Sequence, residues 1–258
     1  MNTDKKVLNS DRYMLQSVDK AVRILDLFVD HTELGATDIA EAMDMNKSTA
    51  FRFLTTLENC GLLYRTERAK YRLGLKLFSL GQLTYGRMNF ASCAHPHLQR
   101  LMETTGETAL LAVTDGSTGI IYIDRVVSCA NLRITIEIGR RYEAHHTAIG
   151  KAFLAYQNET FLEQYYKNAD FTPLTERSII SPDVLATHLL QVRERQYALD
   201  NEESESGLFC YGAPILSAQG ESIAAISISG PVTRMKTNQH QKIASLQEAA
   251  RRIASGLQ

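Results

Sequence analysis

Residues 36–71 read ATDIAEAMDMNKSTAFRFLTTLENCGLLYRTERAKY, and their spacing predicts a short helix, a tight turn and a second helix, followed by a two-stranded hairpin. Thr37 and Asn46 are candidate N-caps of the two helices, and Gly61 is suited to end the second. The second helix is predicted to bury a stripe at i, i+3, i+4 and i+7, formed by Ala50, Phe53, Leu54 and Leu57. This order of elements predicts a winged helix-turn-helix.

The opposite face of the second helix is polar and basic. Its side chains can all donate hydrogen bonds and suit phosphates and base edges in a major groove: Lys47, Ser48, Thr49, Arg52 and Thr55. Between residues 47 and 76, seven Lys or Arg residues stand against two Glu residues, whereas the whole chain has a formal net charge of -1. A basic segment in a nearly neutral chain indicates a polyanionic partner such as DNA. The alternative is an ordinary solvated helix face.

The segments on either side complete the predicted domain. Ser17 is a candidate cap of a preceding helix that buries one apolar stripe: Val18, Ala21, Val22, Leu25 and Phe28. Two wing strands are predicted at 62–65 and 70–73, where Arg68 and Lys70 can follow a sugar-phosphate backbone. The predicted DNA-binding residues are Thr37, Lys47, Ser48, Thr49, Arg52, Thr55, Arg68 and Lys70.

The chain is long enough for two domains. It has 258 residues, of which 44% are hydrophobic. Residues 75–88 predict a linker helix, and its Leu77, Leu80 and Leu83 present more apolar surface than one small domain covers. Either a second subunit or the chain's own second domain can pack on it. The predicted division is a flexible tail (1–14), a winged helix-turn-helix domain (15–74), a linker helix (75–89) and a second domain (90–258).

In the second domain, β-rich runs alternate with helical segments. The β-rich runs lie at 107–116, 119–128, 131–139, 208–216 and 222–229. Helical spacing is found at 97–105, 146–157, 182–196 and 236–256. Strands flanked by helices predict a mixed α/β (α+β) fold, with helices packed on an antiparallel sheet that can close over a pocket.

Other classes of protein are disfavoured. No apolar run approaches the roughly 18 residues needed to span a bilayer, and the start MNTDKKVLNSD is too polar for a signal peptide, so we expect a cytoplasmic protein without a membrane partner. The cysteines form no CxxC pair, which disfavours a disulfide framework and a zinc finger. No GxSxG, GxxxxGK[ST] or HExxH motif is present. We therefore expect no enzyme, no catalytic residue and no cofactor.

The best candidate for a metal site is Cys93 with His95 and His97. Cys93 and His97 are one helical turn apart, but Pro96 lies within that spacing. A coincidence of two ligands is the better interpretation, so no metal site is predicted.

Five blocks of the sequence carry a resemblance to a known family. They are SVDKAVRILDLF (17–28), KSTAFRFLTTLENCGLLYRTERAKYRLGLKLFSLG (47–81), HTAIGKAFLA (146–155), YALDNEESESGLFCYGAPI (197–215) and AAISISGP (224–231). In this order they resemble the IclR family of bacterial transcriptional regulators. The pieces NLRITIEIGRR and TERSIIS look most similar to the branch that includes the ketodeoxygluconate repressor.

The resemblance implies a C-terminal GAF-like domain that binds a small metabolite, often an organic or sugar acid. The family's pocket positions match Ala148, Ile149, Asp200, Cys210, Ser227 and Ser229. Backbone N–H groups at a helix start favour a carboxylate, and serine hydroxyls add donors. Each position also has an ordinary interpretation: the serines alternate with isoleucines as on any half-buried strand, Cys210 is a small core residue, and Asp200 is a solvated loop acid.

Three further features bear on the resemblance. Asn46 stands where the family often has proline, and His146 stands at the pocket rim where a small residue is usual. Gly150 is expected to permit a close approach of helix and sheet.

These observations favour a sequence-specific DNA-binding transcriptional regulator, most simply a repressor, controlled by a 2-keto or sugar acid. The family implies a homodimer or homotetramer that binds a double-stranded DNA operator. The alternative is a metabolite-binding protein or an enzyme that uses the C-terminal domain, with the winged helix as a protein-contact module.

Overall fold

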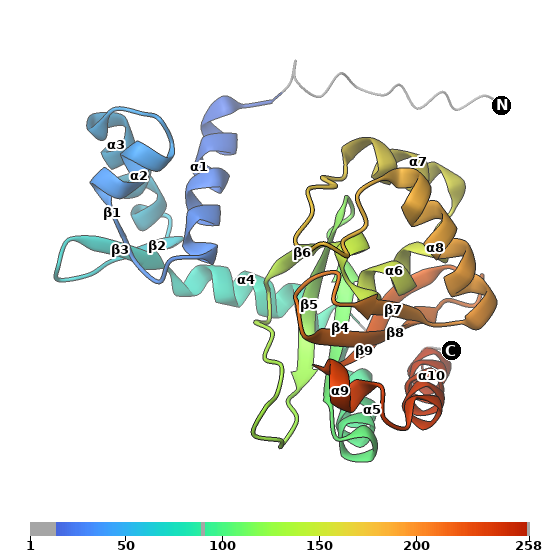
Figure 1. Ribbon diagram of the computed structural model, residues 1–258. Coiled ribbons are helices and arrows are strands. Elements are labelled where there is room, and N and C mark those ends of the chain that lie inside the picture. The colour runs from blue at the N-terminus through green and yellow to red at the C-terminus, as the bar shows by residue number, and fades with distance from the viewer. Residues whose placement is uncertain (1–13, 89–90, 257–258) are drawn as a thin grey trace. The chain divides into compact units, whose positions relative to one another are not determined.

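The computed structural model describes residues 14–88 and 91–256, which form two compact units divided after Thr84 (Figure 1). The division falls inside helix α4 (Leu75–Gly86), which occupies most of the predicted linker. The predicted flexible tail lies outside the described residues except for Met14. In the part of the chain that is described, no helix combines the length and the apolar character needed to cross a membrane.

The N-terminal unit is a helix-turn-helix with a small antiparallel sheet. Its elements are α1 (Gln16–Asp26), η2 (Leu27–Val29), β1 (Leu34–Gly35), α2 (Ala36–Ala42), α3 (Lys47–Asn59), β2 (Leu63–Arg65) and β3 (Lys70–Leu73). The strand order is β1-β3-β2, so the predicted hairpin is confirmed and gains a short third strand. Apolar side chains from all three helices and the hairpin form one core, which includes Ile24, Phe28, Ile39, Leu54 and Tyr71.

The ends of α3 follow the sequence closely. The Asn46 side chain accepts a hydrogen bond from the backbone N–H of Thr49 at 2.8 Å, as an N-cap does. Gly61, just beyond the helix, has a φ of +74°, the left-handed conformation that glycine adopts without strain. Both predictions for α3 are confirmed.

The starts of the two preceding helices differ from prediction. Thr37 lies inside α2, and the cap position is held by Gly35, whose N–H donates to Asp38 Oδ2 at 2.8 Å. The carboxylate of Asp38 reaches back to that N–H, so a side-chain cap at Thr37 is not required. Likewise α1 begins at Gln16 with Leu15 at its cap position, two residues before the predicted cap Ser17.

The stripe predicted for the first helix is confirmed only in part: Ala21 and Leu25 on α1 pack partly buried against the core, as does the buried Phe28 in η2. Ile24 and Phe28 are buried in the core, whereas Val18 and Val22 are 56% and 51% exposed. The sequence of α1 is apolar on two faces, and spacing alone does not decide which face meets the core. The valines instead line a groove between α1 and α3, which Phe53 also borders, so Phe53 is only half-buried.

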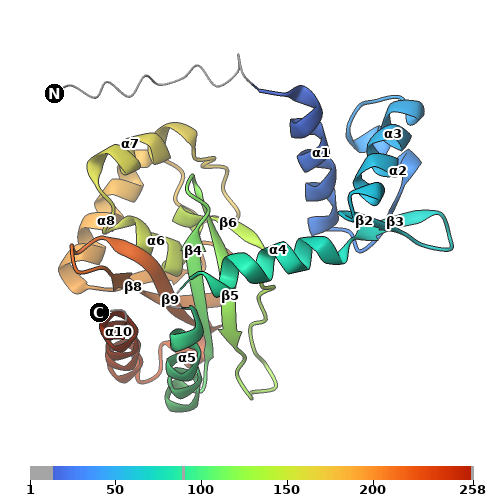
Figure 2. The same ribbon diagram turned by 180° about the vertical axis from the view of Figure 1, so that it is seen from behind.

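The C-terminal unit is a six-stranded antiparallel sheet of order β6-β5-β4-β9-β8-β7 (Figures 1 and 2). Its strands are β4 (Thr108–Thr114), β5 (Gly119–Val126), β6 (Arg141–Glu143), β7 (Ala198–Asn201), β8 (Leu208–Leu216) and β9 (Ser222–Pro231). Its helices are α5 (Ala91–Thr105), η3 (Ala144–His146), α6 (Ala148–Leu154), α7 (Glu159–Asn168), α8 (Pro182–Arg195), α9 (Val232–Met235) and α10 (Gln239–Ser255).

Helices cover both faces of this sheet. One core lies between the sheet and α5 and α10, and a second lies between the sheet and α6, α7 and α8. The predicted α+β class is therefore confirmed, and four of the five predicted strands are found. The spacing did not reveal α7, β6 or β7.

The predicted strand at 131–139 is wrong. This segment forms no strand. The carbonyl groups of Leu132, Ile134 and Ile136 accept from side chains, and the one backbone bond from the segment to the sheet that the described residues show runs from the Gly139 N–H to the carbonyl of Tyr122 on β5, at 2.8 Å. Thr108 Oγ1 donates to the carbonyl of Ile134 at 2.9 Å, and Arg234 donates to the carbonyl of Leu132 at 2.8 Å. The apolar alternation of the segment reflects a wall packed over the sheet and not a strand of the ladder.

Candidate functional site

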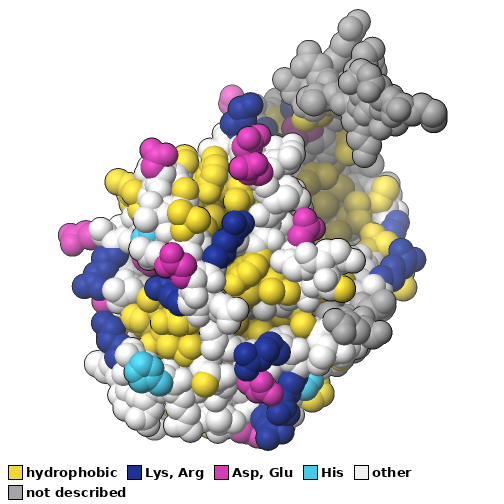
Figure 3. All heavy atoms as spheres, turned by 90° about the vertical axis from the view of Figure 1, so that its right-hand side faces the viewer, with side chains coloured by type: hydrophobic (Ala, Val, Ile, Leu, Met, Phe, Trp, Pro, Cys, Tyr) yellow, Lys and Arg dark blue, Asp and Glu magenta, His cyan; other side chains and the backbone are white. Residues whose placement is uncertain are grey.

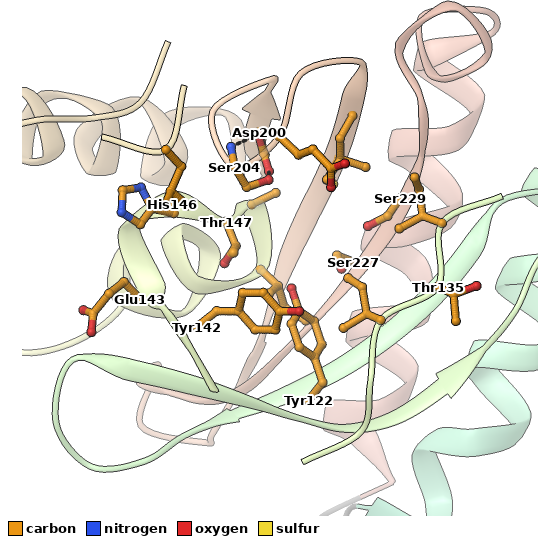
Figure 4. Close-up of a pocket in the computed structure, with 18 residues that line it drawn as sticks. Tyr122, Thr135, Tyr142, Glu143, His146, Thr147, Asp200, Ser204, Ser227 and Ser229 are labelled. Atoms are coloured by element: carbon orange, nitrogen blue, oxygen red, sulfur yellow. Dashed lines mark hydrogen bonds between the residues drawn. The ribbon is translucent and has the colours of Figure 1, made fainter. Parts of the chain in front are cut away.

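A cavity of about 160 Å³ lies in the C-terminal unit between the sheet and the start of α6 (Figure 4). It is lined by all six residues that the resemblance indicated: Ala148, Ile149, Asp200, Cys210, Ser227 and Ser229. These residues come from α6, β7, β8 and β9, so the fold brings four separate segments to one place. The size suits a small metabolite, since pockets for drug-sized ligands measure roughly 300–1,000 Å³.

The floor of the cavity is built by strand register. Asp200 on β7 pairs with Cys210 on β8, and Cys210 pairs with Ser229 on β9, so the three side chains form a row across adjacent strands. Ser227 lies two residues from Ser229 and therefore on the same face. The serines do alternate with isoleucines as on an ordinary strand, but the face that they occupy lines a cavity.

The start of α6 closes one side of the cavity. Thr147 caps the helix by accepting from the N–H of Gly150 at 3.0 Å. The N–H groups of Ala148 and Ile149 come before the first N–H that such a helix can bond internally. A Cβ at Gly212 on β8 would lie 2.3 Å from the carbonyl oxygen of Ala148, so glycine is required where the sheet approaches the helix.

Gly150 has a different role from the one expected. A Cβ at this position would lie 2.2 Å from the carbonyl oxygen of Ala144, so the close approach is to the preceding η3 turn and not to the sheet.

Asp200 is a buried strand residue and not a solvated loop acid. It is 1% exposed, and its carboxylate accepts from the backbone N–H of Glu203 at 2.8 Å and from the side chain of Ser204. Burial raises the pKa of Asp200, although the hydrogen bond from Ser204 and the charge of Lys151 oppose that rise. Lys151 forms a buried ion pair with Glu203, whose backbone N–H is the donor to Asp200.

Several lining residues escaped the sequence reasoning. They are Tyr122, Ile134, Thr135, Ile136, Tyr142, Glu143, Thr147, Leu174, Ser204, Glu205 and Leu208, and His146, expected at the rim, also lines the cavity. Tyr142 and Glu143 lie two or three residues before the HHTAIGK block (145–151), which is the one local pattern that points to them.

The predicted DNA-binding residues lie on α3, α2 and the hairpin. Ser48, Arg52 and Thr55 are spaced to lie opposite the buried Ala50 and Leu54. Lys47, Ser48 and Arg52 are exposed, whereas Thr49 and Thr55 are half-buried. Thr49 and Arg52 both line the groove toward α1. Thr37 on α2 and Arg68 in the hairpin turn are exposed. Phe51, 49% exposed on α3, was not predicted as part of this surface.

Part of the predicted basic charge is compensated. Lys70 lies 3.5 Å and Arg72 lies 2.8 Å from the carboxylate of Glu33, and these interactions lower the pKa of Glu33. Glu33 precedes the segment in which the charges were counted, so the sequence count overstated the basic field. On the side of the C-terminal unit drawn in Figure 3, by comparison, basic and acidic side chains are interspersed.

The candidate metal ligands do not converge. Among the described residues, no group of three His, Cys, Asp or Glu side chains could hold a metal ion. His95 instead lies 2.8 Å from Asp124 through its Nδ1 atom.

Comparisons with known proteins agree with both units. The model of the IclR helix-turn-helix domain matches residues 17–67, and that of the C-terminal domain of bacterial transcriptional regulator IclR matches residues 82–255. The chain is 37% identical over 243 residues to the HTH-type transcriptional regulator KdgR of Escherichia coli (strain K12). The matched region covers 93% of this chain and 92% of that protein.

Solved structures show the same fold over nearly the full length. The crystal structure of the Thermotoga maritima IclR has a TM-score of 0.71 at 33% identity, covering 95% of this chain and 99% of that one. An IclR homologue from Microbacterium hydrocarbonoxydans complexed with 4-hydroxybenzoate has a TM-score of 0.80 at 24% identity, covering 93% and 98%. The chain therefore belongs to the IclR family of bacterial transcriptional regulators, in which a helix-turn-helix domain is joined to a C-terminal effector-binding domain.

Proposed function

We propose that this regulator is a cytoplasmic repressor whose C-terminal cavity binds a small carboxylic acid of the 2-keto or sugar acid class. The observation that carries the proposal is the convergence of Asp200, Cys210, Ser227 and Ser229 with the start of α6 on one cavity.

The cavity would bind the carboxylate of the acid through hydrogen-bond donors and not through a positively charged side chain. Among the described residues that line it, none is Lys or Arg. The N–H groups of Ala148 and Ile149 suit a carboxylate, because they lie at the positive end of a helix. The hydroxyls of Ser227 and Ser229 add donors, and Asp200 accepts from a hydroxyl of the ligand.

The N-terminal unit is proposed to bind DNA through α3. Ser48, Arg52 and Thr55 would enter the major groove, and Arg68 would contact phosphates beside it. Phe51 adds an apolar side chain of the kind that contacts a thymine methyl group. Lys47, Thr49, Thr37 and Lys70 would support backbone contacts, with Lys70 also held by Glu33.

A homodimer, or a tetramer of two dimers, would place two such surfaces on a pseudo-palindromic operator with half-sites about 10 bp or a multiple apart. Helix α4 supplies a surface for pairing, because Leu75, Phe78 and Leu83 on it are 83%, 64% and 60% exposed. The effector would act by binding two arrangements of the dimer with different affinities.

The test is a mobility-shift titration on the DNA upstream of the protein's own gene, with and without a panel of 2-keto and sugar acids. We expect a shift that weakens steeply with salt, because Lys and Arg contacts release counterions, and that one acid changes. A shift that no acid changes would contradict the proposed effector class. Absence of any shift at low salt would contradict the operator and favour the enzyme or binding-protein alternative, which turnover assays on the same acids would then address.

A further inference from the structure

Two basic side chains of the hairpin lie on one face of β3. Lys70 and Arg72 are two residues apart on this strand, and Tyr71 between them is buried in the core, so both basic side chains project from the opposite, outer face of the small sheet. Their side chains are 45% and 57% exposed, respectively. A partner in solution can therefore reach both cations.

The carboxylate of Glu33 bridges the two cations. Its Oε2 atom accepts from Nε and Nη2 of Arg72 at 3.2 Å and 2.8 Å, and its Oε1 atom lies 3.5 Å from Nζ of Lys70. Glu33 directly precedes β1, the strand that pairs with β3, so the backbone fixes the carboxylate beside the pair. The Glu33 side chain is only 22% exposed, less than either cation.

The bridging carboxylate resembles a phosphate in the way it binds these donors. Arginine binds carboxylates and phosphates through the same planar set of N–H groups, and lysine binds both through its charge. A phosphate of the DNA backbone that approached this face would therefore compete with Glu33 for the same donors.

Glu33 also reduces the charge that DNA meets at this place. Two cations stand against one carboxylate, so the group of three has a net charge of one positive unit. The Debye length is about 10 Å at 0.1 M salt, so a carboxylate this close to both cations cancels part of their field before screening does.

We propose that Lys70 and Arg72 form a binding site for a phosphate of the DNA backbone, and that the carboxylate of Glu33 occupies this site in the free protein and so lowers the affinity for DNA. Arg72, absent from the predicted DNA-binding residues, thereby joins that surface. This inference rests on the proposed DNA contact of the N-terminal unit. Because phosphates carry no sequence information, Glu33 acts on the part of the affinity that does not depend on sequence.

The test measures binding of the full chain to a labelled duplex of arbitrary sequence, about 30 bp long, by fluorescence anisotropy at pH 7.5 and at salt concentrations from about 50 to 200 mM. Glu33→Gln keeps the shape of the side chain and an acceptor for Arg72 but removes the charge. We expect it to tighten binding roughly fivefold at the lowest salt. The plot of log K against log salt concentration should steepen by about 1, because each phosphate that is neutralised contributes about 0.9. Addition of Arg72→Gln to Glu33→Gln should return the slope close to the wild-type value.

Asp26→Asn serves as the matched control, because it makes the same change of charge at an exposed position of the same unit, at the end of α1. It should leave the slope unchanged. A purely structural role of Glu33 would lower the thermal stability of Glu33→Gln without tightening DNA binding, so the two roles are distinguishable.

Three outcomes would overturn the inference while the DNA contact of the wild type stands: an unchanged slope in Glu33→Gln, weaker binding in Glu33→Gln, or equal steepening in Asp26→Asn. If the wild type does not bind the duplex at the lowest salt, the proposed DNA contact fails and the inference fails with it.

Discussion

The polar side chains of α3 and those of the cavity in the C-terminal unit differ in how they are held. Ser48 and Arg52 are exposed, and binding DNA would replace water around them. Ser48 has one hydrogen bond, from its hydroxyl to Asn46 Oδ1 at 2.8 Å, and it lies within the same exposed surface. Asp200 and Glu143, by contrast, are fixed by hydrogen bonds from neighbouring groups before any ligand arrives. The exposed surface can adapt to its partner, whereas the cavity is preorganised for one.

The same difference determines which side chains can be substituted without loss of stability. Side chains that contact only water in the free protein can be removed at little cost to folding, since surface substitutions usually change stability by about 0.5 kcal/mol or less. Buried charged groups cannot be removed at little cost, because each one is the ion-pair partner of another buried group. The two units should therefore respond differently to equivalent substitutions.

The largest effect is expected from Lys151→Met, which leaves the buried Glu203 without its partner. Breaking a buried ion pair from one side costs about 3–5 kcal/mol, so the urea midpoint of the C-terminal unit should fall sharply. Lys167→Met on the exposed surface of α7 is the control and should change little. If Lys151→Met lowers the urea midpoint no more than Lys167→Met does, buried charged groups are not more sensitive to substitution than exposed ones. The double variant Lys151→Met/Glu203→Leu should recover much of the loss.

Arg52→Ala should weaken operator binding by about 1–3 kcal/mol, or roughly tenfold to a hundredfold, while the unfolding midpoint stays unchanged. Arg251→Ala, on exposed α10 beside Glu248, removes the same charge from the other unit and should leave DNA binding intact. Mobility-shift titrations at one fixed salt concentration measure both. Unaltered affinity in Arg52→Ala would place the DNA contact elsewhere than on α3.

The pH dependence of folding should report the buried His145. Burial lowers its pKa from 6.5 to about 3, so below pH 6.5 the unfolded chain binds a proton that the folded chain does not. Stability should therefore fall as pH falls through this window, by about 1.4 kcal/mol per pH unit from this group. The free energy of unfolding, measured with urea at several pH values between 4 and 7, should depend less steeply on pH in His145→Gln than in the wild type. The difference in slope should correspond to about one proton. The exposed His31→Gln control should retain the slope, and an equal slope in all three proteins would contradict the prediction.

Asn46→Ala should give the smallest effect. It tests whether the exposed surface of α3 also contains a hydrogen bond that contributes to stability. Loss of an N-cap costs about 1 kcal/mol, and Asn46→Asp should retain most of it. Thermal unfolding of the N-terminal unit measures the difference. If Asn46→Ala proves as stable as the wild type, the 2.8 Å bond to the N–H of Thr49 does not stabilise α3.

The sequence predicted those features that depend on neighbours within one or two turns. The α3 cap at Asn46 and the stop at Gly61 are local, and so is the spacing of Ala50, Leu54 and Leu57. Which face of α1 meets the core depends on residues far along the chain, so the choice of Val18 and Val22 was wrong.

The cavity shows the same limit. Six of its residues were identified through the resemblance, and not through spacing, because their proximity arises from strand register. Tyr122 on β5 has no pattern near it in the sequence that indicates a cavity, and Glu143 on β6 is indicated only by the nearby HHTAIGK block. For 131–139, alternation predicted a strand, but the acceptors of that segment are occupied by Thr108 and Arg234.

That segment has a consequence for engineering. Residues 131–139 form a wall of the cavity through Ile134, Thr135 and Ile136, and they are joined to the sheet by single hydrogen bonds, such as that from Thr108 to the carbonyl of Ile134, instead of by a ladder. Substitutions of the lining side chains that keep these bonds should therefore leave the ladder of β4, β5 and β9 intact. The side chains that line the cavity from this wall are thus a replaceable part of the molecule. If the proposed function holds, substitutions at Ile134, Thr135 and Ile136 offer a direct route to biosensors with altered effector preference and an unchanged DNA-binding surface.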